Sequence, residues 1–317
     1  MLNRPPHEAN VAEQTEHSIN GGGMKFDYFS PDEKNRLSIF ASAANTDRDS
    51  YYGPGNDPLK AYGKTTDLTA MGGAQYVHTF DKCFFMPSDL TAGLEYNRDR
   101  LKDNMWGYNR HTDQTVNIYS AFLQNEWKND RWGILIGGRL DKHNMVDNVI
   151  FSPRANLRFN PTQNINLRLS YSSGFRAPQA FDEDMHIENV GGTVAMIERA
   201  KDLKEEKSQS FSVSADMYHR FGAFQTNLLI EGFYTRLTDV FVLGKPYDRG
   251  DGILVKTRSN GPGAKVMGLT LEGKVAYLSI LQIQAGLTLQ RSRYDEPHKW
   301  HCLLYTSPSP RDAHESR

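Results

Sequence analysis

A two-residue alternation of apolar and polar side chains runs through most of this chain and limits it to β-structure. In residues 164–172 the apolar positions are Ile165, Leu167, Leu169 and Tyr171, and polar residues stand between them. The same pattern recurs in four more stretches, residues 90–97, 210–217, 269–277 and 280–290. Because successive side chains of a strand point to opposite faces, each stretch predicts a strand with one apolar and one polar face.

Two all-β architectures produce such strands. A soluble β-sandwich, such as a carbohydrate-binding module, buries the apolar faces between two sheets. A membrane β-barrel turns the apolar faces toward lipid and lines its lumen with the polar ones. No apolar stretch is long enough for a helical span of about 18 residues, but a spanning strand needs only about 9–11. Alternation alone does not separate the two architectures.

The lengths of the connections favour the membrane barrel. We predict about twelve strands, and short and long connections alternate between them. The predicted strands are residues 24–30, 35–46, 65–80, 88–98, 114–128, 131–141, 150–159, 164–175, 207–218, 224–239, 253–277 and 281–293. The long connections are residues 47–64, 99–113, 142–149, 176–206 and 240–252. Outer-membrane barrels have short periplasmic turns and long extracellular loops, so we expect the long connections to face outward.

Aromatic residues near the predicted strand ends fit the interfacial girdles of a barrel, although strand propensity alone also favours them. They are Phe26, Tyr28, Trp127, Trp132, Phe159, Tyr171, Tyr218, Tyr234 and Tyr277.

Composition excludes several other classes of protein. The formal net charge of -1 gives no electrostatic reason to expect nucleic acid as a partner. The cysteines, Cys83 and Cys302, form no CxxC pair, so neither a zinc site nor a disulfide framework is predicted. No catalytic grouping of residues is present, and we predict neither an enzyme nor a cofactor.

Two motifs resemble the barrel of TonB-dependent receptors. The strand that ends near residue 175 carries Gly174, Phe175, Arg176, Ala177 and Pro178, which is similar to the motif with which a strand of that family reaches the surface. Residues 203–208 resemble the motif with which the family's chain re-enters the barrel. They match it at Leu203, Lys204, Glu206, Lys207 and Ser208, whereas Glu205 replaces the family's proline.

Two further stretches extend the resemblance. Residues 263–272 are similar to a family stretch in which a glycine precedes an apolar residue and a glutamate-bearing strand, and the three motifs stand in the family's order. Residues 179–184 resemble the version found in Bacteroidetes-type receptors.

The resemblance implies an all-β, transmembrane antiparallel β-barrel, of which this chain supplies a part. The family's barrel has about 22 strands around a globular plug, so about twelve strands make residues 24–300 a partial barrel without its plug. We interpret residues 1–23 as the remnant of an outer loop and residues 301–317 as a non-native tail. The N-terminus has no apolar signal-peptide core, so we expect the true start of the exported protein to lie upstream.

The function implied by the resemblance is active uptake of a scarce ligand across the outer membrane. Iron–siderophore and cobalamin are the leading ligands, and the TonB–ExbB–ExbD complex would act through the plug. Outer-membrane lipid and lipopolysaccharide would surround the barrel. A passive porin is the alternative within the barrel class, and the β-sandwich is the alternative outside it.

Candidate ligand contacts lie in the two long connections that combine aromatic residues with arginine or histidine. Such groups can stack on a flat ligand or form paired hydrogen bonds with an anionic one. The six candidates are Tyr51, Tyr52, Trp106, Tyr108, Arg110 and His111. The alternative is that they pack the loops against each other. We expect the acidic residues of loop 176–206, among them Asp184, to be solvated or bridged to lipopolysaccharide by divalent ions, and we predict no metal site.

Overall fold

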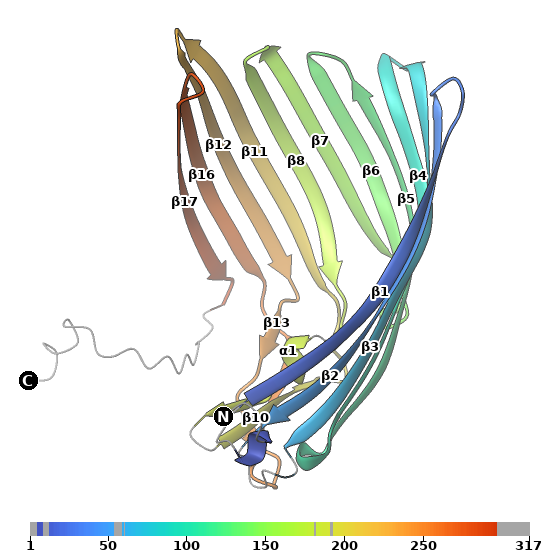
Figure 1. Ribbon diagram of the computed structural model, residues 1–317, viewed down its shortest axis with the longest axis vertical. Coiled ribbons are helices and arrows are strands. Elements are labelled where there is room, and N and C mark those ends of the chain that lie inside the picture. The colour runs from blue at the N-terminus through green and yellow to red at the C-terminus, as the bar shows by residue number, and fades with distance from the viewer. Residues whose placement is uncertain are drawn as a thin grey trace, which may run out of the picture.

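The computed structural model describes residues 5–8, 13–53, 59, 61–180, 182–190 and 193–296. Its main feature is one sheet of twelve antiparallel strands that curves around a hollow (Figure 1). The strands in spatial order are β1 (Glu13–Phe29), β2 (Asn35–Tyr52), β3 (Tyr62–Cys83), β4 (Met86–Met105), β5 (Arg110–Lys128), β6 (Trp132–His143), β7 (Ile150–Thr162), β8 (Ile165–Arg176), β11 (Glu206–Phe221), β12 (Phe224–Thr238), β16 (Ala264–Tyr277) and β17 (Leu281–Tyr294). Each strand therefore pairs with its neighbours as a barrel wall requires.

A second, smaller sheet lies at the end of the wall where the long connections gather (Figure 1). It contains β13 (Phe241–Leu243), β15 (Ile253–Asn260), β10 (Thr193–Arg199) and β9 (Glu188–Val190), and β14 (Tyr247–Asp248) pairs with β15. The pairing of β10 with β15 is parallel. Helix α1 (Asp182–Met185) and the 3-10 turns η1 (Pro6–Glu8) and η3 (Trp106–Tyr108) complete the described elements.

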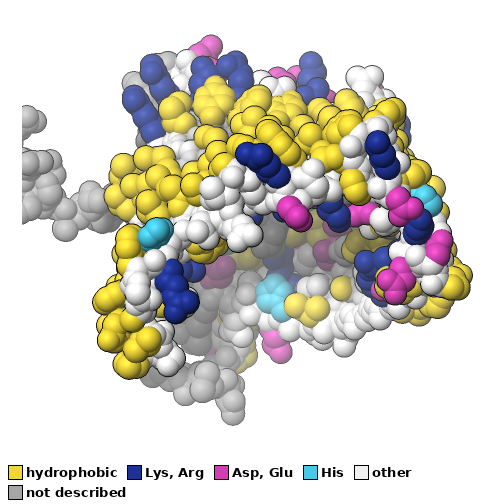
Figure 2. All heavy atoms as spheres, turned by 90° about the horizontal axis from the view of Figure 1, so that it is seen from above, with side chains coloured by type: hydrophobic (Ala, Val, Ile, Leu, Met, Phe, Trp, Pro, Cys, Tyr) yellow, Lys and Arg dark blue, Asp and Glu magenta, His cyan; other side chains and the backbone are white. Residues whose placement is uncertain are grey.

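The apolar faces of the wall strands point away from the hollow. Leu169 is 51% exposed, Ile283 is 60% exposed and Leu287 is 54% exposed. Figure 2 shows hydrophobic side chains around the outer rim and charged side chains toward the hollow. A sandwich would bury these leucine and isoleucine side chains between two sheets, so the β-sandwich alternative is wrong.

The exposed apolar surface forms a band with aromatic edges. On β16 the outward positions from Leu269 to Tyr277 pair with apolar or small residues of β17 and match the length of roughly 9–11 residues that crosses a bilayer. At the short-turn edge, Trp132 packs on Phe159 with ring centroids 4.2 Å apart. At the other edge, Tyr171 lies against Phe211 at 4.7 Å. The arrangement follows the apolar band and aromatic girdles of outer-membrane barrels.

The predicted alternation of short and long connections is confirmed, but several strand ends are not where we predicted them. Strand β1 begins at Glu13, so residues 13–23 are not part of a loop. Much of the predicted loops 47–64 and 99–113 continues β2, β3, β4 and β5. Beyond the apolar band both faces of a strand can be polar, so the alternation ends there while the backbone pairing continues.

The predicted strand 253–277 was also wrong, because it consists of two strands in different sheets. Strand β15 ends at Asn260 and β16 begins at Ala264. Pro262 lies between them, and a proline has no N–H to donate to a sheet ladder. The break lets the chain pass from the small sheet back to the wall. The predicted tail 301–317 lies outside the described residues.

No helix in the described ranges has both the length and the apolar character to cross a bilayer.

Candidate functional site

The two family-like motifs lie side by side at the rim of the wall. In the register of β8 with β11, Gly174 faces Ser208 and Arg176 faces Glu206. The carboxylate of Glu206 accepts a hydrogen bond of 2.8 Å from the backbone N–H of Phe241, and the Arg176 guanidinium lies 5.5 Å from the centre of the Phe241 ring. The motifs therefore fix the positions at which two outer segments leave and re-enter the wall.

The remaining motif residues anchor these segments. Ala177 is buried with Val146 and Ile150, and Phe175 packs against the same cluster. The carbonyl of Pro178 accepts a hydrogen bond of 3.0 Å from Arg199. These contacts attach the chain that leaves β8 to the neighbouring connection and to β10.

The chain that returns to β11 is held by one asparagine. The backbone N–H of Lys204 donates to the side chain of Asn260 at 2.7 Å, and the Asn260 amide donates back to the Lys204 carbonyl at 3.0 Å. The chain that returns to β11 is thereby tied to the end of β15, at the point where the second outer segment leads back to the wall.

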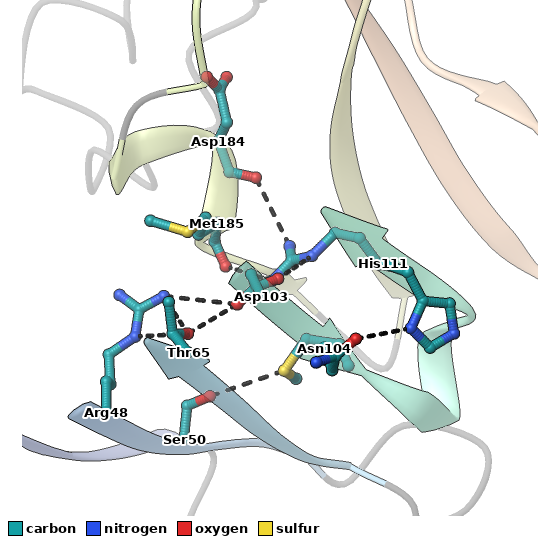
Figure 3. Close-up of polar contacts among 10 residues, drawn as sticks. Arg48, Ser50, Thr65, Asp103, Asn104, His111, Asp184 and Met185 are labelled. Carbon is teal, nitrogen blue, oxygen red and sulfur yellow. Dashed lines mark hydrogen bonds and ion pairs between the residues drawn. The ribbon is translucent and has the colours of Figure 1, made fainter. Parts of the chain in front are cut away.

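A buried carboxylate organises the inner side of the rim. Asp103 has no exposed surface, and its carboxylate lies 2.9 Å from Nε of Arg110 and 3.8 Å from Nη2 of Arg48 (Figure 3). Thr65 donates to the same carboxylate at 2.7 Å and accepts from Arg48 at 3.2 Å. Strands β2, β3, β4 and β5 each contribute one residue, so the network joins four adjacent strands.

Arg110 extends this network to the outer segments. Its Nη2 donates to the carbonyl of Met185 at 2.8 Å, and its Nη1 lies 3.5 Å from the carbonyl of Asp184 (Figure 3). The carboxylate of Asp184 in turn lies 2.9 Å from Arg258 of β15. We expected Asp184 to be solvated, but it is only 6% exposed because this ion pair buries it.

An apolar cluster lies beside the polar network. It contains Tyr51, Tyr52, Ala61, Met105, Tyr108, Ile187, Met196 and Ile253. The Tyr108 hydroxyl donates to the carbonyl of Tyr52, and burial raises the pKa of Tyr108 to about 12. Residues from the wall and from both outer segments thus form one packed unit.

The six predicted ligand contacts fall into two groups. Four of them are buried, namely Tyr51, Tyr52, Tyr108 and Arg110. Trp106 is 60% exposed at the start of η3, and His111 is exposed with Nδ1 2.9 Å from Asn104. The burial of these four residues agrees with the alternative that they pack the loops against each other. Ligand contact by any of the six stays a prediction.

A groove with a volume of about 620 Å³ opens between the start of β5, the end of β8 and β10. Its lining includes Arg110, His111, Arg199, Lys201 and Arg249, together with Asp184 and Glu198. Basic side chains therefore outnumber acidic ones around the groove. It also contains Pro178 and Leu203 of the two motifs.

Sequence reasoning missed Arg199 and Arg249. Arg199 donates to Gln114 at 2.7 Å, and burial lowers its pKa. Arg249 donates to the carbonyl of Tyr108 at 2.8 Å and pairs with Asp251. Both residues belong to long connections whose path no periodicity predicts, so the sequence carried no signal for their place beside the groove. Among the described residues, no group of three His, Cys, Asp or Glu side chains could hold a metal ion.

The outward apolar band, the short turns at one end and the anchored segments at the other define an outer-membrane β-barrel wall. The family model for the TonB dependent receptor-like β-barrel matches residues 8–309, and the chain belongs to this family. Its members are transporters and not enzymes, and the chain is located in the outer membrane. The porin alternative is thereby excluded.

Solved structures of receptors share the fold. The siderophore receptor PirA from Pseudomonas aeruginosa superposes with a TM-score of 0.74 at 15% identity, covering 90% of this chain and 52% of that one. The FrpB iron transporter from Neisseria meningitidis gives a TM-score of 0.64 at 14% identity, covering 88% of this chain and 44% of that one. The chain therefore spans about half the length of these structures.

A curated relative matches at the level of sequence. The probable hemoglobin and hemoglobin-haptoglobin-binding protein 3 of Haemophilus influenzae is 23% identical over 220 residues, which are 68% of this chain and 19% of the relative.

Proposed function

We propose that the receptor containing this chain imports an iron–siderophore across the outer membrane, driven by the TonB–ExbB–ExbD complex through a plug. The observation that carries the proposal is the groove at the rim, because its lining has more basic than acidic side chains. Arginine and lysine bind carboxylate and related oxygen anions well, and many iron chelates expose such oxygens. The siderophore receptor among the similar structures supports the same ligand class. Cobalamin is the second candidate.

His111 lines the groove, and Trp106 is exposed in the turn before β5. We propose these two as the direct ligand contacts of the six predicted residues. Arg110 then supports the groove through its ion pair with Asp103, and Tyr51, Tyr52 and Tyr108 support the rim from within the apolar cluster.

The test is uptake by cells that carry the receptor gene with its natural flanking sequence. Radiolabelled ferric siderophores and labelled cobalamin are supplied separately, with and without functional TonB. We expect TonB-dependent uptake of an iron chelate. Uptake that persists without TonB would contradict the proposal, and TonB-dependent uptake of cobalamin alone would show that the imported ligand is cobalamin and not an iron–siderophore.

A charge reversal tests the groove itself. Lys201 is exposed in the groove lining, so Lys201→Glu should weaken binding of an anionic iron chelate by about fivefold or more through like-charge repulsion. Lys245→Glu is the matched control, because Lys245 is exposed on the other outer segment and does not line the groove. Equal binding of the iron chelate by Lys201→Glu and Lys245→Glu would show that the groove is not part of the ligand site.

We propose also that the receptor is of the Bacteroidetes type, on the basis of residues 179–184. The DNA that flanks the gene would test this, since it identifies the genome to which the gene belongs.

A further inference from the structure

One histidine is completely buried at the end of β6, on the hollow side of the wall. His143 has no exposed surface, and its strand parity is opposite to that of Leu140, which is 48% exposed on the lipid side. The preceding residue, Lys142, pairs with Tyr119, the last exposed aromatic residue of β5 toward the long connections. His143 pairs one residue further out, with Ile118, so it lies in the rim beyond the apolar band.

The hydrogen bonds of His143 require a neutral imidazole. The backbone N–H of Met145 donates to Nδ1 at 3.0 Å, so Nδ1 carries no proton. The proton of the neutral ring is then on Nε2, which lies 3.2 Å from the side-chain oxygen of Gln179 and donates to it. Both ring nitrogens are thereby occupied, one as acceptor and one as donor.

The two partners of His143 belong to different outer segments. Met145 is in the connection between β6 and β7, and the next residue, Val146, donates its N–H to the His143 carbonyl at 3.2 Å. Gln179 is in the segment that leaves β8, and its N–H donates to the carbonyl of Ala177 at 2.8 Å. Val146 and Ala177 are buried in one apolar cluster. A single imidazole therefore joins the two segments beside this cluster.

A second proton on His143 is incompatible with this arrangement. A protonated ring carries N–H groups at both nitrogens, so Nδ1–H would point at the N–H of Met145, and two donors cannot form a hydrogen bond. The charge would also lie in a site without water, which is costly unless an anion compensates it. The ring must therefore leave its site in order to become charged.

The neighbouring elements offer an imidazolium little compensation. On β6 the carboxylate of Asp141 favours the charged ring, but it already accepts hydrogen bonds from Ser120 at 2.6 Å and Arg139 at 2.8 Å. Burial accordingly lowers the pKa of His143 from its ordinary value of 6.5, although Gln179 and Asp141 act in the opposite direction.

The remaining groups around the site are neutral, cationic or in water. Strand β5 contributes Ile118 and β7 contributes Ile150, which are both apolar. The cations Lys142 and Arg199 donate to carbonyls of the same two segments, and the side chain of Asp147 is exposed. These groups give a charged ring no further reason to stay.

We propose that His143 is a pH-sensitive latch, which holds the segment after β8 against the β6–β7 connection while neutral and releases it when protonated. Protonation of buried histidines is a general way to switch an interface in mildly acidic conditions. Because Met145, Pro178 and Ala180 line the groove, release changes its wall. The latch acts whichever ligand the groove binds, so it goes beyond the proposed import of an iron–siderophore.

The experiment measures hydrogen exchange by mass spectrometry on the full-length receptor in detergent, from about pH 5 to about pH 8. Protection factors, which correct for the intrinsic effect of pH, are compared for residues 144–147 and 177–180. The test variant is H143Q, because glutamine can accept from Met145 and donate to Gln179 but does not titrate in this range. The control H219Q removes an exposed histidine at the opposite end of the wall.

We expect protection of both segments in the unchanged receptor and in H219Q to fall by up to about tenfold for each pH unit below about 6.5. H143Q should show no such fall, and the same fall in H143Q would overturn the proposal. Nitrogen NMR of labelled histidine in the unchanged receptor requires no variant. It should show an Nε2–H tautomer that is shielded from solvent at pH 8 and is lost together with the protection of residues 177–180. Protonation of this ring while residues 177–180 stay protected would also overturn the latch.

Discussion

At the scale of single residues, the rim depends on a few buried polar groups with several partners each. Asp103 is fully buried. Its carboxylate accepts a hydrogen bond from Thr65 and forms ion pairs with Arg48 and Arg110. Removing one member of a buried ion network costs more than the network contributes, because the remaining charges stay out of water. When an exposed carboxylate is removed, water solvates the charge of its former partner, so the loss of stability is small.

The variant Asp103→Ala should therefore destabilise the rim by roughly 3–5 kcal/mol, since two buried guanidinium groups lose this carboxylate. The effect is measurable as faster hydrogen exchange of the amides of η3 and α1. The control is Asp113→Ala, which removes an exposed carboxylate and should cost less than about 1 kcal/mol. Comparable exchange in both variants would show that the Asp103 network is not needed.

Tyr108 gives a prediction on pH. Its pKa is raised from 10.0 to about 12, so above about pH 10 an unfolded rim loses this proton while the folded rim keeps it. The stability that Tyr108 contributes is complete below pH 10 and is lost as the pH rises toward 12. A difference ultraviolet titration against Tyr108→Phe should show one tyrosine that ionises near pH 12; ionisation near 10 would place Tyr108 in water.

At the scale of elements, the parallel pair β10–β15 joins two outer segments that leave different parts of the wall. The register places Ala195 opposite Leu254 and Glu198 opposite Thr257. The segment before β11 and the segment after β12 therefore form one structural unit, which the Arg110 and Asp184 contacts attach to the wall.

A disulfide tests this pairing. In a background in which Cys83 and Cys302 are serine, A195C/L254C should oxidise readily, because paired strands bring the Cα atoms into the range of about 4.4–6.8 Å that a disulfide requires. The control A195C/T257C moves one cysteine three residues along β15 and should stay reduced. Mass spectrometry of unreduced peptides distinguishes the two, and a disulfide only in the control would refute the register.

At the scale of the whole molecule, the two faces of the wall meet different solvents. Leu169 and Ser170 are adjacent in β8, so their side chains point to opposite faces of the wall, and Leu169, which is 51% exposed, lies on the lipid side. Leu169→Arg should destabilise the barrel by roughly 2–4 kcal/mol, and Ser170→Arg should be tolerated. The amount of heat-modifiable receptor in outer-membrane fractions measures both. Equal loss would contradict the assignment of the faces.

The sequence was most informative where lipid meets the wall. Residues 164–175 were predicted as a strand, and β8 is Ile165–Arg176, because a bilayer enforces alternation at each step. Residues 193–199 were predicted as loop but form β10, whose partner β15 lies far along the chain. No local pattern specifies such a distant pairing.

In the candidate site, too, local sequence patterns identified some residues, whereas residues placed by contacts between distant segments were missed. The combination of aromatic residues with arginine selected Tyr51, Tyr52, Tyr108 and Arg110, and the structure brings these four to one rim. Asp103 was not selected, because it falls in the predicted connection 99–113, where an aspartate looks solvated until its arginine partners are placed. Arg199 and Arg249 depend on the course of long connections, which tertiary contacts determine.

The shared sheet of β10 and β15 also affects how such receptors can exchange sequence. The hairpin β11–β12 lies between the two segments in the gene but outside their pairing. A recombination point within that hairpin would take the two halves of the outer sheet from different parents. Their edges would then meet without having been selected together, so functional chimaeras should exchange both segments as one block.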